Sequence, residues 1–555
     1  MLRWNPMPVT QPVPERVWGR NYGRSLVISR QGIVATSHAL ASQAGAQILA
    51  RGGSAVDAAI TANAVLGVVE PNMDGIGGDL FVLYWEAKTG KLHGLNASGP
   101  APHGLSPQFL ASHGITTMPL AGAHTVTVPG AVDGWSKLQQ RFGKLAWSQL
   151  FSAVIAYADQ GFPVTEAIEE SWSAPIAVER LLTNSESARV FLPGGEAPRV
   201  GQLFRNPDAA RCFRLLAEQG PRAFYEGEIA AAILRTLQNL GSTMTASDLA
   251  AYSAEWVEPI SIDYRGWRVF ELPPNGQGMA ALEMLNIMET APPEAGGPST
   301  AGELHKRIEA MKLAYSDVYR YNADPRTNAV PVTTLLSKDH ARARATLIDP
   351  RKANGSVAPA RIAGSDTTYL TVVDREGNIA SWIQSIYNSF GSGITVEGMG
   401  FPLQNRGAGF TLDPTHPNVL AGGKRPYHTI IPGFMERGGQ RIGFGIMGGP
   451  NQPLAHAQFV SNVVDYGMNL QEALETPRFT KLAPEGNDVI IESRVPAATR
   501  DALTAMGHEI TLGREYTQQM GRGQAILHDA STATNYAASD PRADGAATPE
   551  PIAAE

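Results

Sequence analysis

The sequence contains very little cysteine: Cys212 is the only one among 555 residues. An intrachain disulfide framework is therefore excluded, and the protein has to be stable without bridges. Cys212 lies in a helical-looking run between Arg211 and Arg214. These two arginines are the only nearby feature that would favour a reactive thiolate, so we do not expect Cys212 to be a nucleophile.

Other features are missing as well. No run approaches the length of a membrane span, and residues 1–25 mix arginines with prolines and lack the apolar core of a signal peptide, so a cytoplasmic protein without a membrane partner is expected. The net charge of −7 without a basic cluster argues against nucleic acid as a partner. The twelve histidines are scattered and none forms a metal-binding pattern with a carboxylate. We expect no metal and no cofactor.

What is present is typical of a packed globular protein, with 43% hydrophobic and 17% charged residues. A short strand at 32–36 precedes two Ala-rich helices at 38–49 and 54–69, and a Gly-rich turn at 71–79 leads into a strong strand at 80–85. That turn joins a helix to a strand and lacks the Lys-Ser/Thr ending of a phosphate loop, so it indicates a close backbone approach instead.

The rest of the chain alternates between helical and extended patterns. Residues 145–240 are mainly helical in pattern, and apolar extended runs follow near 260–272 and 429–447. Helices around apolar strands predict a layered α/β protein with helices on both faces of the sheets. The tail from 531 to 555 consists mostly of small, acidic and proline residues, and we expect it to be disordered.

A hairpin at 366–386 stands out because β-branched and aromatic residues flank a Gly-containing turn. If Asp374 faces Asn378, Thr367 faces Ser385, with Cβ atoms about 5 Å apart. A threonine at the head of a hairpin beside a second hydroxyl is a candidate nucleophile. These residues alone equally fit an ordinary strand start. The segment before it, 354–366, is poor in large apolar residues and is expected to be an exposed, cleavable connector.

Several separated motifs in this order resemble the γ-glutamyltranspeptidase family. They are Ser54–Ala59, Gly75–Asp79, Asp366–Asp374, Phe390–Ile394, Gly423–Pro426 and Gly448–Gly449, and they extend over most of the chain. The resemblance implies an N-terminal nucleophile hydrolase with an αββα four-layer sandwich, made as a zymogen that cuts its own chain between Asp366 and Thr367. The cut would give a large subunit, 1–366, and a small subunit, 367–555, that stay associated as one intertwined unit.

The resemblance also implies the catalytic residues. Cleavage frees the α-amino group of Thr367, which has a pKa near 8 and can take the hydroxyl proton, directly or through a water. The hydroxyl then attacks an amide carbonyl and forms an acyl-enzyme that water or an amine resolves. Gly448 and Gly449 match the family's oxyanion hole, although a simple β-turn is the alternative. Ser385 matches a hydroxyl residue that orients the nucleophile.

The sequence departs from the family where the glutamyl group would bind. The residues now at the positions expected to hold the α-carboxylate and α-ammonium group are Ser98, Tyr387, Arg406, Gly409, His428 and Thr429. At these positions the sequence lacks the family's carboxylate and has a guanidinium instead. This replacement predicts a substrate with an anionic acyl group that has no α-ammonium. Arg406 can bind a carboxylate bidentately, with hydrogen bonds from Tyr387 and His428. The alternatives are a structural ion pair for Arg406 and a satisfied, non-catalytic His428.

These observations predict an autoprocessed Thr-nucleophile amidohydrolase that acts on a small-molecule amide of a γ-glutamyl or related carboxylated acyl group. One alternative is a glutaryl/cephalosporin-type acylase, or an oxamate-like amide hydrolase, without γ-glutamyl activity. Another, from a different class, is a processed binding protein without catalysis. The sequence leaves open the leaving group, the choice between water and an amine as acceptor, and the oligomeric state.

Overall fold

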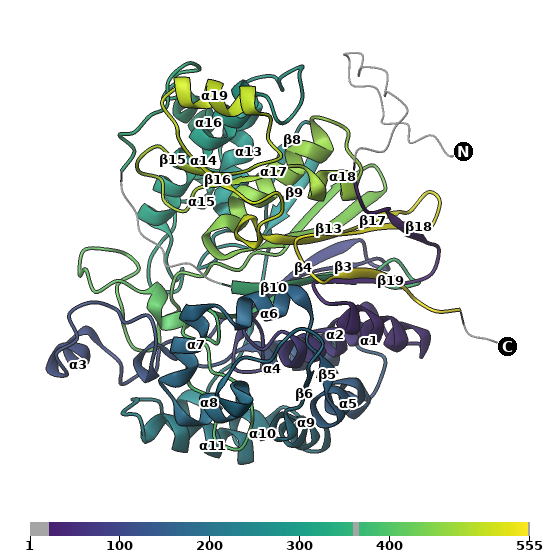
Figure 1. The fold of residues 1–555 in the computed structure, drawn as a ribbon, viewed down its shortest axis with the longest axis vertical. Helices are drawn as coiled ribbons and strands as arrows, with labels where there is room; N and C mark the ends of the chain where they lie inside the picture. Colours follow the sequence, from purple (N-terminus) through teal and green to yellow (C-terminus); the bar gives the residue numbers. More distant parts are fainter. Residues whose placement is uncertain (1–21, 359–365, 553–555) are drawn as a thin grey trace.

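Two seven-stranded antiparallel sheets lie face to face at the centre of the computed structural model, which describes residues 22–358 and 366–552 (Figure 1). The first sheet has the order β19-β2-β10-β11-β3-β4-β7, and the second has the order β1-β18-β17-β13-β12-β9-β8. The strands of the first sheet, in that order, are Ala546–Pro549, Ile33–Thr36, Asp366–Val373, Ile379–Tyr387, Asp79–Glu86, Lys91–Ala97 and Glu255–Val257. Those of the second are Val27–Ser29, Thr534–Ser539, Arg522–Asp529, Gln440–Met447, Gly433–Arg437, Trp267–Glu271 and Ile260–Tyr264.

The central strands alternate their side chains between two apolar layers. In β10, Tyr369 and Val373 pack between the two sheets, whereas Leu370 and Val372 face the core formed with the first helical layer. Because both faces are covered, all nine residues of β11 are buried. Period-two alternation with apolar residues on both faces explains why the sequence showed continuous apolar runs here.

Helices cover the outer face of each sheet, so the expected αββα four-layer sandwich is confirmed (Figure 1). Helices α1 (Ala39–Ala50) and α2 (Ala55–Val69) lie on the first sheet. The second sheet is covered by α13 (Gly278–Glu289), α17 (Gln452–Val464) and α18 (Leu470–Glu475), and α14 (Ala301–Tyr321) packs on α13. Ser54 begins α2 in a capping box with Asp57. The small alanines of α1 and α2 let both helices approach the sheet closely.

The predicted helical region is also confirmed. Residues 145–240 contain α5 (Ser152–Gln160), α6 (Glu166–Trp172), α7 (Pro175–Leu182), α8 (Ser185–Phe191), α9 (Pro207–Gln219), α10 (Arg222–Tyr225) and α11 (Glu228–Gln238), with the short strands β5 (Phe162–Pro163) and β6 (Leu203–Phe204). Helices α4 (Ala131–Phe142) and α12 (Ala246–Ala250) flank this region. A small sheet of β14 (Phe479–Thr480), β15 (Asp488–Glu492) and β16 (Glu509–Gly513) lies beside α19 (Ala497–Ala505). The remaining helices are α3 (Pro107–Ser112), α15 (Val332–Leu335) and α16 (Lys338–Ala345).

The prediction of a disordered tail from 531 to 555 is wrong for residues 531–552, the part of the tail that the structure describes. Residues 534–539 form β18 inside the second sheet, and residues 546–549 form β19 at the edge of the first. The small side chains of Ala537 and Ala538 are buried, and Arg542 forms a buried ion pair with Glu492. A composition of alanine and paired charges resembles that of a disordered segment, but here it is used for close packing.

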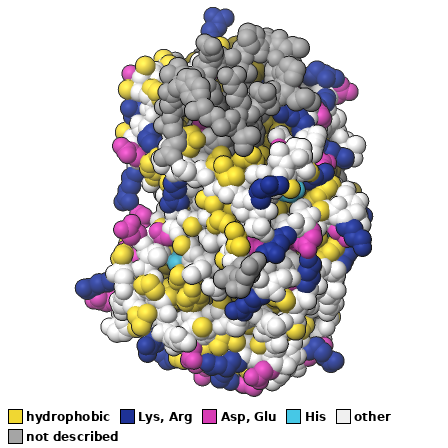
Figure 2. All heavy atoms as spheres, turned by 90° about the vertical axis from the view of Figure 1, so that its right-hand side faces the viewer, with side chains coloured by type: hydrophobic (Ala, Val, Ile, Leu, Met, Phe, Trp, Pro, Cys, Tyr) yellow, Lys and Arg dark blue, Asp and Glu magenta, His cyan; other side chains and the backbone are white. Residues whose placement is uncertain are grey.

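Charged side chains of both signs are intermixed on the face seen in Figure 2, where no single-sign patch gathers. Within the described parts of the chain, no helix combines the length and the apolar character needed to cross a membrane.

Candidate active site

The β10–β11 hairpin places Thr367 beside Ser385 at the end of the first sheet. The predicted register holds from Val373–Ile379 to Thr368–Gln384 and then shifts, so that Asp366 pairs with Tyr387. At this shift the Oγ1 of Thr367 donates a hydrogen bond of 3.2 Å to the Oγ of Ser385, and both residues are buried. A local bulge therefore aims the candidate nucleophile at the hydroxyl that the sequence paired with it.

The Gly-rich turn before β3 packs directly against this hairpin. A Cβ at Gly78 would collide with the carbonyl oxygen of Ser385, so the predicted close backbone approach is confirmed. Asp74, in the same turn, accepts a hydrogen bond of 2.9 Å from the Oγ1 of Thr368. Burial raises the pKa of Asp74 to about 7, although hydrogen bonds to its carboxylate partly oppose this.

Arg406 is the central charge of the site. Its Nη2 donates to the Oγ of Ser385 at 3.1 Å and its Nη1 donates to the Oγ1 of Thr429 at 2.8 Å. Two hydrogen bonds therefore link the guanidinium to the Thr367 hydroxyl through Ser385. The side chain is fully buried, and burial lowers its pKa to about 10.

No acidic group forms an ion pair with Arg406 among the residues that the structure describes, and there the Nε has no hydrogen-bond partner. The described part of the chain therefore supplies no partner for the alternative of a structural ion pair at this arginine. A fully buried guanidinium that has only two hydrogen bonds and no ion pair among the described residues is a costly arrangement that a bound anion would relieve.

Tyr387 covers the guanidinium. Its ring centre lies 4.1 Å from the Cζ of Arg406, and its backbone has a φ of 81°, which is rare for a residue other than glycine. The N–H of Tyr387 donates to the Oγ of Ser385 at 2.8 Å, which holds this conformation. Strained backbone of this kind is often found at functional sites.

His428 is turned toward Asp79 rather than toward Arg406. Its Nε2 lies 3.1 Å from the Oδ2 of Asp79, and its Nδ1 accepts the N–H of Ile430 at 3.4 Å. Burial, together with Arg406, lowers the pKa of His428 well below its usual value, so the neutral ring donates its Nε2–H to Asp79. Both ring nitrogens have protein partners, which favours the alternative of a satisfied histidine.

Asp79 was missed by the sequence analysis, as were the glutamines that hold the site together. The Oδ1 of Asp79 accepts hydrogen bonds from the backbone of Gly99 and Gly130 and from the Nε2 of Gln404. Burial raises the pKa of Asp79 to about 7, partly opposed by Arg406. The only sequence signal was an acidic residue at each end of the Gly-rich turn.

Gly448 and Gly449 lie between β13 and α17, with φ angles of 137° and 59°. Gly448 lines the same cavity as Thr367, of about 870 Å³. The Nε2 of Gln277 donates to the carbonyl oxygens of Gly449 at 2.8 Å and Thr429 at 2.5 Å, and so ties the glycine pair to the Arg406 contacts. Gly449 begins the 3-10 turn Gly449–Asn451, which leads into α17, so the glycine pair lies at the start of a helical segment, where backbone N–H groups suit an anion.

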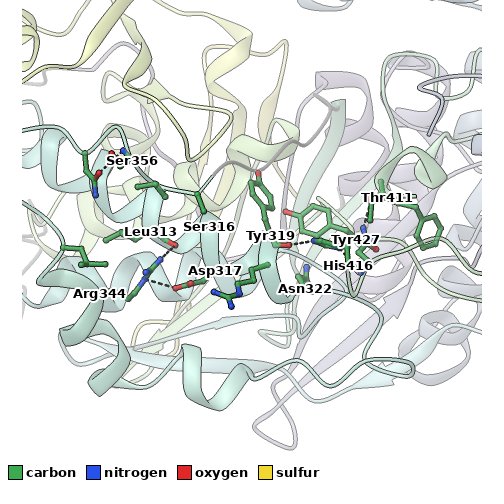
Figure 3. Close-up of a pocket in the computed structure, with 18 of the residues that line it drawn as sticks. Leu313, Ser316, Asp317, Tyr319, Asn322, Arg344, Ser356, Thr411, His416 and Tyr427 are labelled. Carbon is green, nitrogen blue, oxygen red and sulfur yellow. Dashed lines mark hydrogen bonds and ion pairs between the residues drawn. The ribbon is translucent and has the colours of Figure 1, made fainter. Parts of the chain in front are cut away.

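A second cavity, of about 950 Å³, is shown in Figure 3, and Tyr387 is one of the residues that line it. Tyr427 and Gly409 line it with Tyr387, and the Nε2 of His416 hydrogen-bonds to the carbonyl oxygen of Tyr319 in its wall. Residues 354, 356, 357 and 358, which lead toward the proposed cleavage point, also line this cavity. The rest of the expected connector, 359–365, lies outside the described residues.

Other reactive groups are placed away from Thr367. Cys212 is buried, and burial raises the pKa of its thiol, so it is not an activated nucleophile. Two groups of side chains among the described residues have the spacing for a metal ion, and neither includes a residue described above: His305, Glu309 and His508, and Glu283, Asp317 and His340. Each already contacts a cation, because Lys312 pairs with Glu309 and Arg344 pairs with Asp317.

Comparison with known proteins identifies relatives of the whole chain. The family profile described as gamma-glutamyltranspeptidase matches residues 41–550. A glutathione hydrolase-like YwrD proenzyme of Bacillus subtilis is 36% identical over 94% of this chain and 99% of its own. An oxamate amidohydrolase proenzyme of Klebsiella pneumoniae is 32% identical over 94% and 98%. The crystal structure of a cephalosporin acylase from Bacillus halodurans superposes with a TM-score of 0.89 at 41% identity, covering 99% of both chains.

Proposed function

The chain belongs to the gamma-glutamyltranspeptidase family of hydrolases, and from this premise we propose that it is a self-processed amidohydrolase with Thr367 as its nucleophile. Its acyl donor is an amide of a short acyl group that ends in a carboxylate. Self-cleavage between Asp366 and Thr367 divides the precursor into fragments 1–366 and 367–555. The two fragments stay associated and form the active enzyme. The proenzyme names of the relatives support this processing.

The proposed reaction uses Thr367 with Ser385, which contacts it, and with the glycine pair, of which Gly448 lines the same cavity. The freed α-amine of Thr367 takes the Oγ1 proton, and Oγ1 attacks the amide carbonyl while the N–H groups at Gly448 and Gly449 stabilise the oxyanion. The C–N bond breaks as the α-ammonium returns a proton to the leaving amine. Water then adds to the ester, and the acid and free Thr367 are released. Ser385 orients the nucleophile through its 3.2 Å hydrogen bond.

The observation that carries the substrate class is the unpaired, buried guanidinium of Arg406. A carboxylate would satisfy its free Nε and compensate its charge, which is the arrangement that a buried arginine needs. Arg406 and Thr367 both hydrogen-bond to the Oγ of Ser385. A carboxylate bound at Arg406 is therefore separated by only a few covalent bonds of the acyl group from the carbonyl that Thr367 attacks. The ring of Tyr387 has to move toward the larger cavity to admit it.

A γ-glutamyl donor is the second candidate, because one relative is named as glutathione hydrolase-like. The described site offers it little for an α-ammonium group. The acid nearest to Arg406, Asp79, is buried and bonded to His428 and to backbone N–H groups. A binding protein without catalysis is disfavoured because Thr367, Ser385 and the glycine pair are assembled together.

A hydrolysis panel on purified, processed protein tests the proposal. The acyl groups to compare are oxalyl, succinyl, glutaryl and γ-glutamyl, together with butyryl as an uncharged match for succinyl. We expect succinyl or another simple diacid amide to exceed both the butyryl and the γ-glutamyl amide in kcat/KM. Equal turnover of butyryl and succinyl amides would refute the role of Arg406. Failure of an acyl trap to label Thr367 would refute the nucleophile.

A further inference from the structure

The cavity that contains Thr367 is walled by apolar side chains that face solvent. Thirteen large apolar side chains are markedly exposed among the described residues, and five of them line this one cavity. They are Leu120, Ile176, Leu482, Leu512 and Tyr516, with exposures between 40% and 65%. Exposed apolar groups that gather at one site mark a place where an apolar surface binds.

Two structurally separate walls contribute these side chains. Ile176 lies in the first turn of α7, whereas Leu512 lies in β16 and Leu482 just beyond β14. In Figure 1, α6 and α7 lie below β10, and β15 and β16 lie above it. The exposed ion pair between Glu170 of α6 and Arg514, at 2.7 Å, joins the two walls across the cavity.

The charged groups in the cavity are largely occupied by the protein itself. Arg180 donates to the carbonyl oxygens of Ser389 and Gly391, and Arg514 is paired with Glu170. The Nη2 of Arg522 donates a hydrogen bond to the Oγ of Ser171. Its Nη1 has no hydrogen-bond partner among the described residues. Recognition in this cavity therefore depends mainly on the apolar walls.

We propose that the cavity binds the leaving amine of the substrate and that this amine carries a bulky apolar body. The inference rests on the proposed function, which directs the acyl carboxylate inward to Arg406 and so leaves the amine side of the scissile bond facing the cavity. A volume of about 870 Å³ is far larger than ammonia or a small polar amine requires, and lies in the range of cavities that hold drug-sized ligands. The substrate class is then an N-alkyl or N-aryl amide of a short dicarboxylic acid.

A homologous series of amides tests this inference. The acyl group is kept constant as the best one in the acyl panel, and the amine is methylamine, butylamine, hexylamine or glycine. The alkylamines differ little in basicity, so differences in kcat/KM report binding of the alkyl chain. All members form the same acyl-enzyme, so kcat becomes common to the series wherever deacylation is rate-limiting.

We expect kcat/KM to rise at least tenfold from the methyl to the hexyl amide. Ile176→Ser and Leu512→Ser should each lower the hexyl-to-methyl ratio several-fold. Leu240→Ser is the matched control, because Leu240 is 44% exposed but lines neither cavity, and it should keep the wild-type ratio. All variants are compared after self-cleavage and at equal labelling by an acyl trap, so that misfolded protein is not counted.

The outcomes separate this inference from the proposed function. Turnover of the amides with equal kcat/KM for methyl and hexyl members would overturn the apolar amine site while leaving the nucleophile intact. Preference for the glycine amide would overturn it in favour of a carboxylated amine held by Arg522. Absence of turnover for every amide would overturn the proposed function itself.

Discussion

Replacing Arg406 by methionine should remove activity without removing stability. Burial lowers the pKa of Arg406 from its usual value to about 10. At about 1.4 kcal/mol per pKa unit, the buried charge destabilises the folded protein by roughly 3 kcal/mol at neutral pH. Against this, the variant loses two hydrogen bonds from a charged donor, to Ser385 and Thr429, which are worth about 1.5 to 3 kcal/mol each.

The two bonds together outweigh the relieved burial cost by between about 0 and 3 kcal/mol, so the melting temperature of Arg406→Met should fall by no more than a few degrees. The effect on turnover should be large, because truncating one partner of a buried charge pair costs about 2 to 5 kcal/mol. This corresponds to a loss of roughly 30-fold to several thousand-fold in kcat/KM for the carboxylated acyl donor. The butyryl amide, which lacks the carboxylate, should be affected much less.

Arg307→Met is the matched control. Arg307 is buried like Arg406 but pairs with buried Glu303 at 3.0 Å and donates hydrogen bonds to Ser461 and Asn462, so its loss removes an ion pair and two buried hydrogen bonds and should lower the melting temperature. Thermal unfolding and steady-state hydrolysis are measured on processed protein. If Arg406→Met loses as much stability as Arg307→Met while turnover of the carboxylated donor persists, Arg406 is structural and the reasoning fails.

Three further predictions concern the same site. Thr367→Ala should give one uncut chain on a denaturing gel, whereas Thr367→Ser should still give two bands; two bands from the alanine variant would disprove the nucleophile. Gly448→Ala should lower kcat about 100-fold, because φ is 137° and the new Cβ would lie 3.1 Å from the Cα of Gly521; unchanged kcat would place the oxyanion elsewhere. Burial raises the pKa of Asp79 from 3.8 to about 7, so the folded state binds more protons between these values and stability falls as pH rises from about 4 to 7. Above pH 7 the Asp79 carboxylate competes for Arg406, so KM for a carboxylated donor should rise. Asp79→Asn should flatten both the dependence of stability on pH and the dependence of KM on pH. If neither dependence changes in this variant, Asp79 is not the titrating group.

The fold was predictable from the sequence where local patterns and tertiary packing agree. The hairpin that carries Thr367 combines period-two alternation, β-branched residues and a Gly-containing turn, and its register followed from the turn alone. The prediction for the tail was wrong because its alanines and paired charges have the composition of a disordered segment. Only the neighbouring strands, which lie elsewhere in the sequence, reveal that Ala537 and Ala538 fill a tightly packed position.

The site was only partly predictable for a similar reason. Thr367 and Ser385 lie in one hairpin, so local geometry brings them together. The role of Arg406 depends on its contacts with Ser385 and Thr429 in other segments and on its lack of an ion-pair partner among the described residues, which no spacing encodes. Asp79 was overlooked because the Gly-rich turn was examined as a phosphate loop, and the burial of its flanking acids cannot be seen in a sequence.

The sheet order predicts how the proposed fragments behave after cleavage. In the first sheet, β10 and β11 come from the fragment after the cut, and they lie between β2 and β3 from the fragment before it. In the second sheet, β8 and β9 of the first fragment extend a sheet whose central strands belong to the second. Neither fragment can close its hydrophobic core alone, because the apolar face of each sheet is completed by strands of the other fragment.

Fragments 1–366 and 367–555 should therefore co-elute as one species in native size-exclusion chromatography and separate only in denaturant. Separately expressed fragments should be insoluble or unfolded. A folded, soluble fragment 1–366 obtained alone would show that the strands from the second fragment are not needed to complete the core.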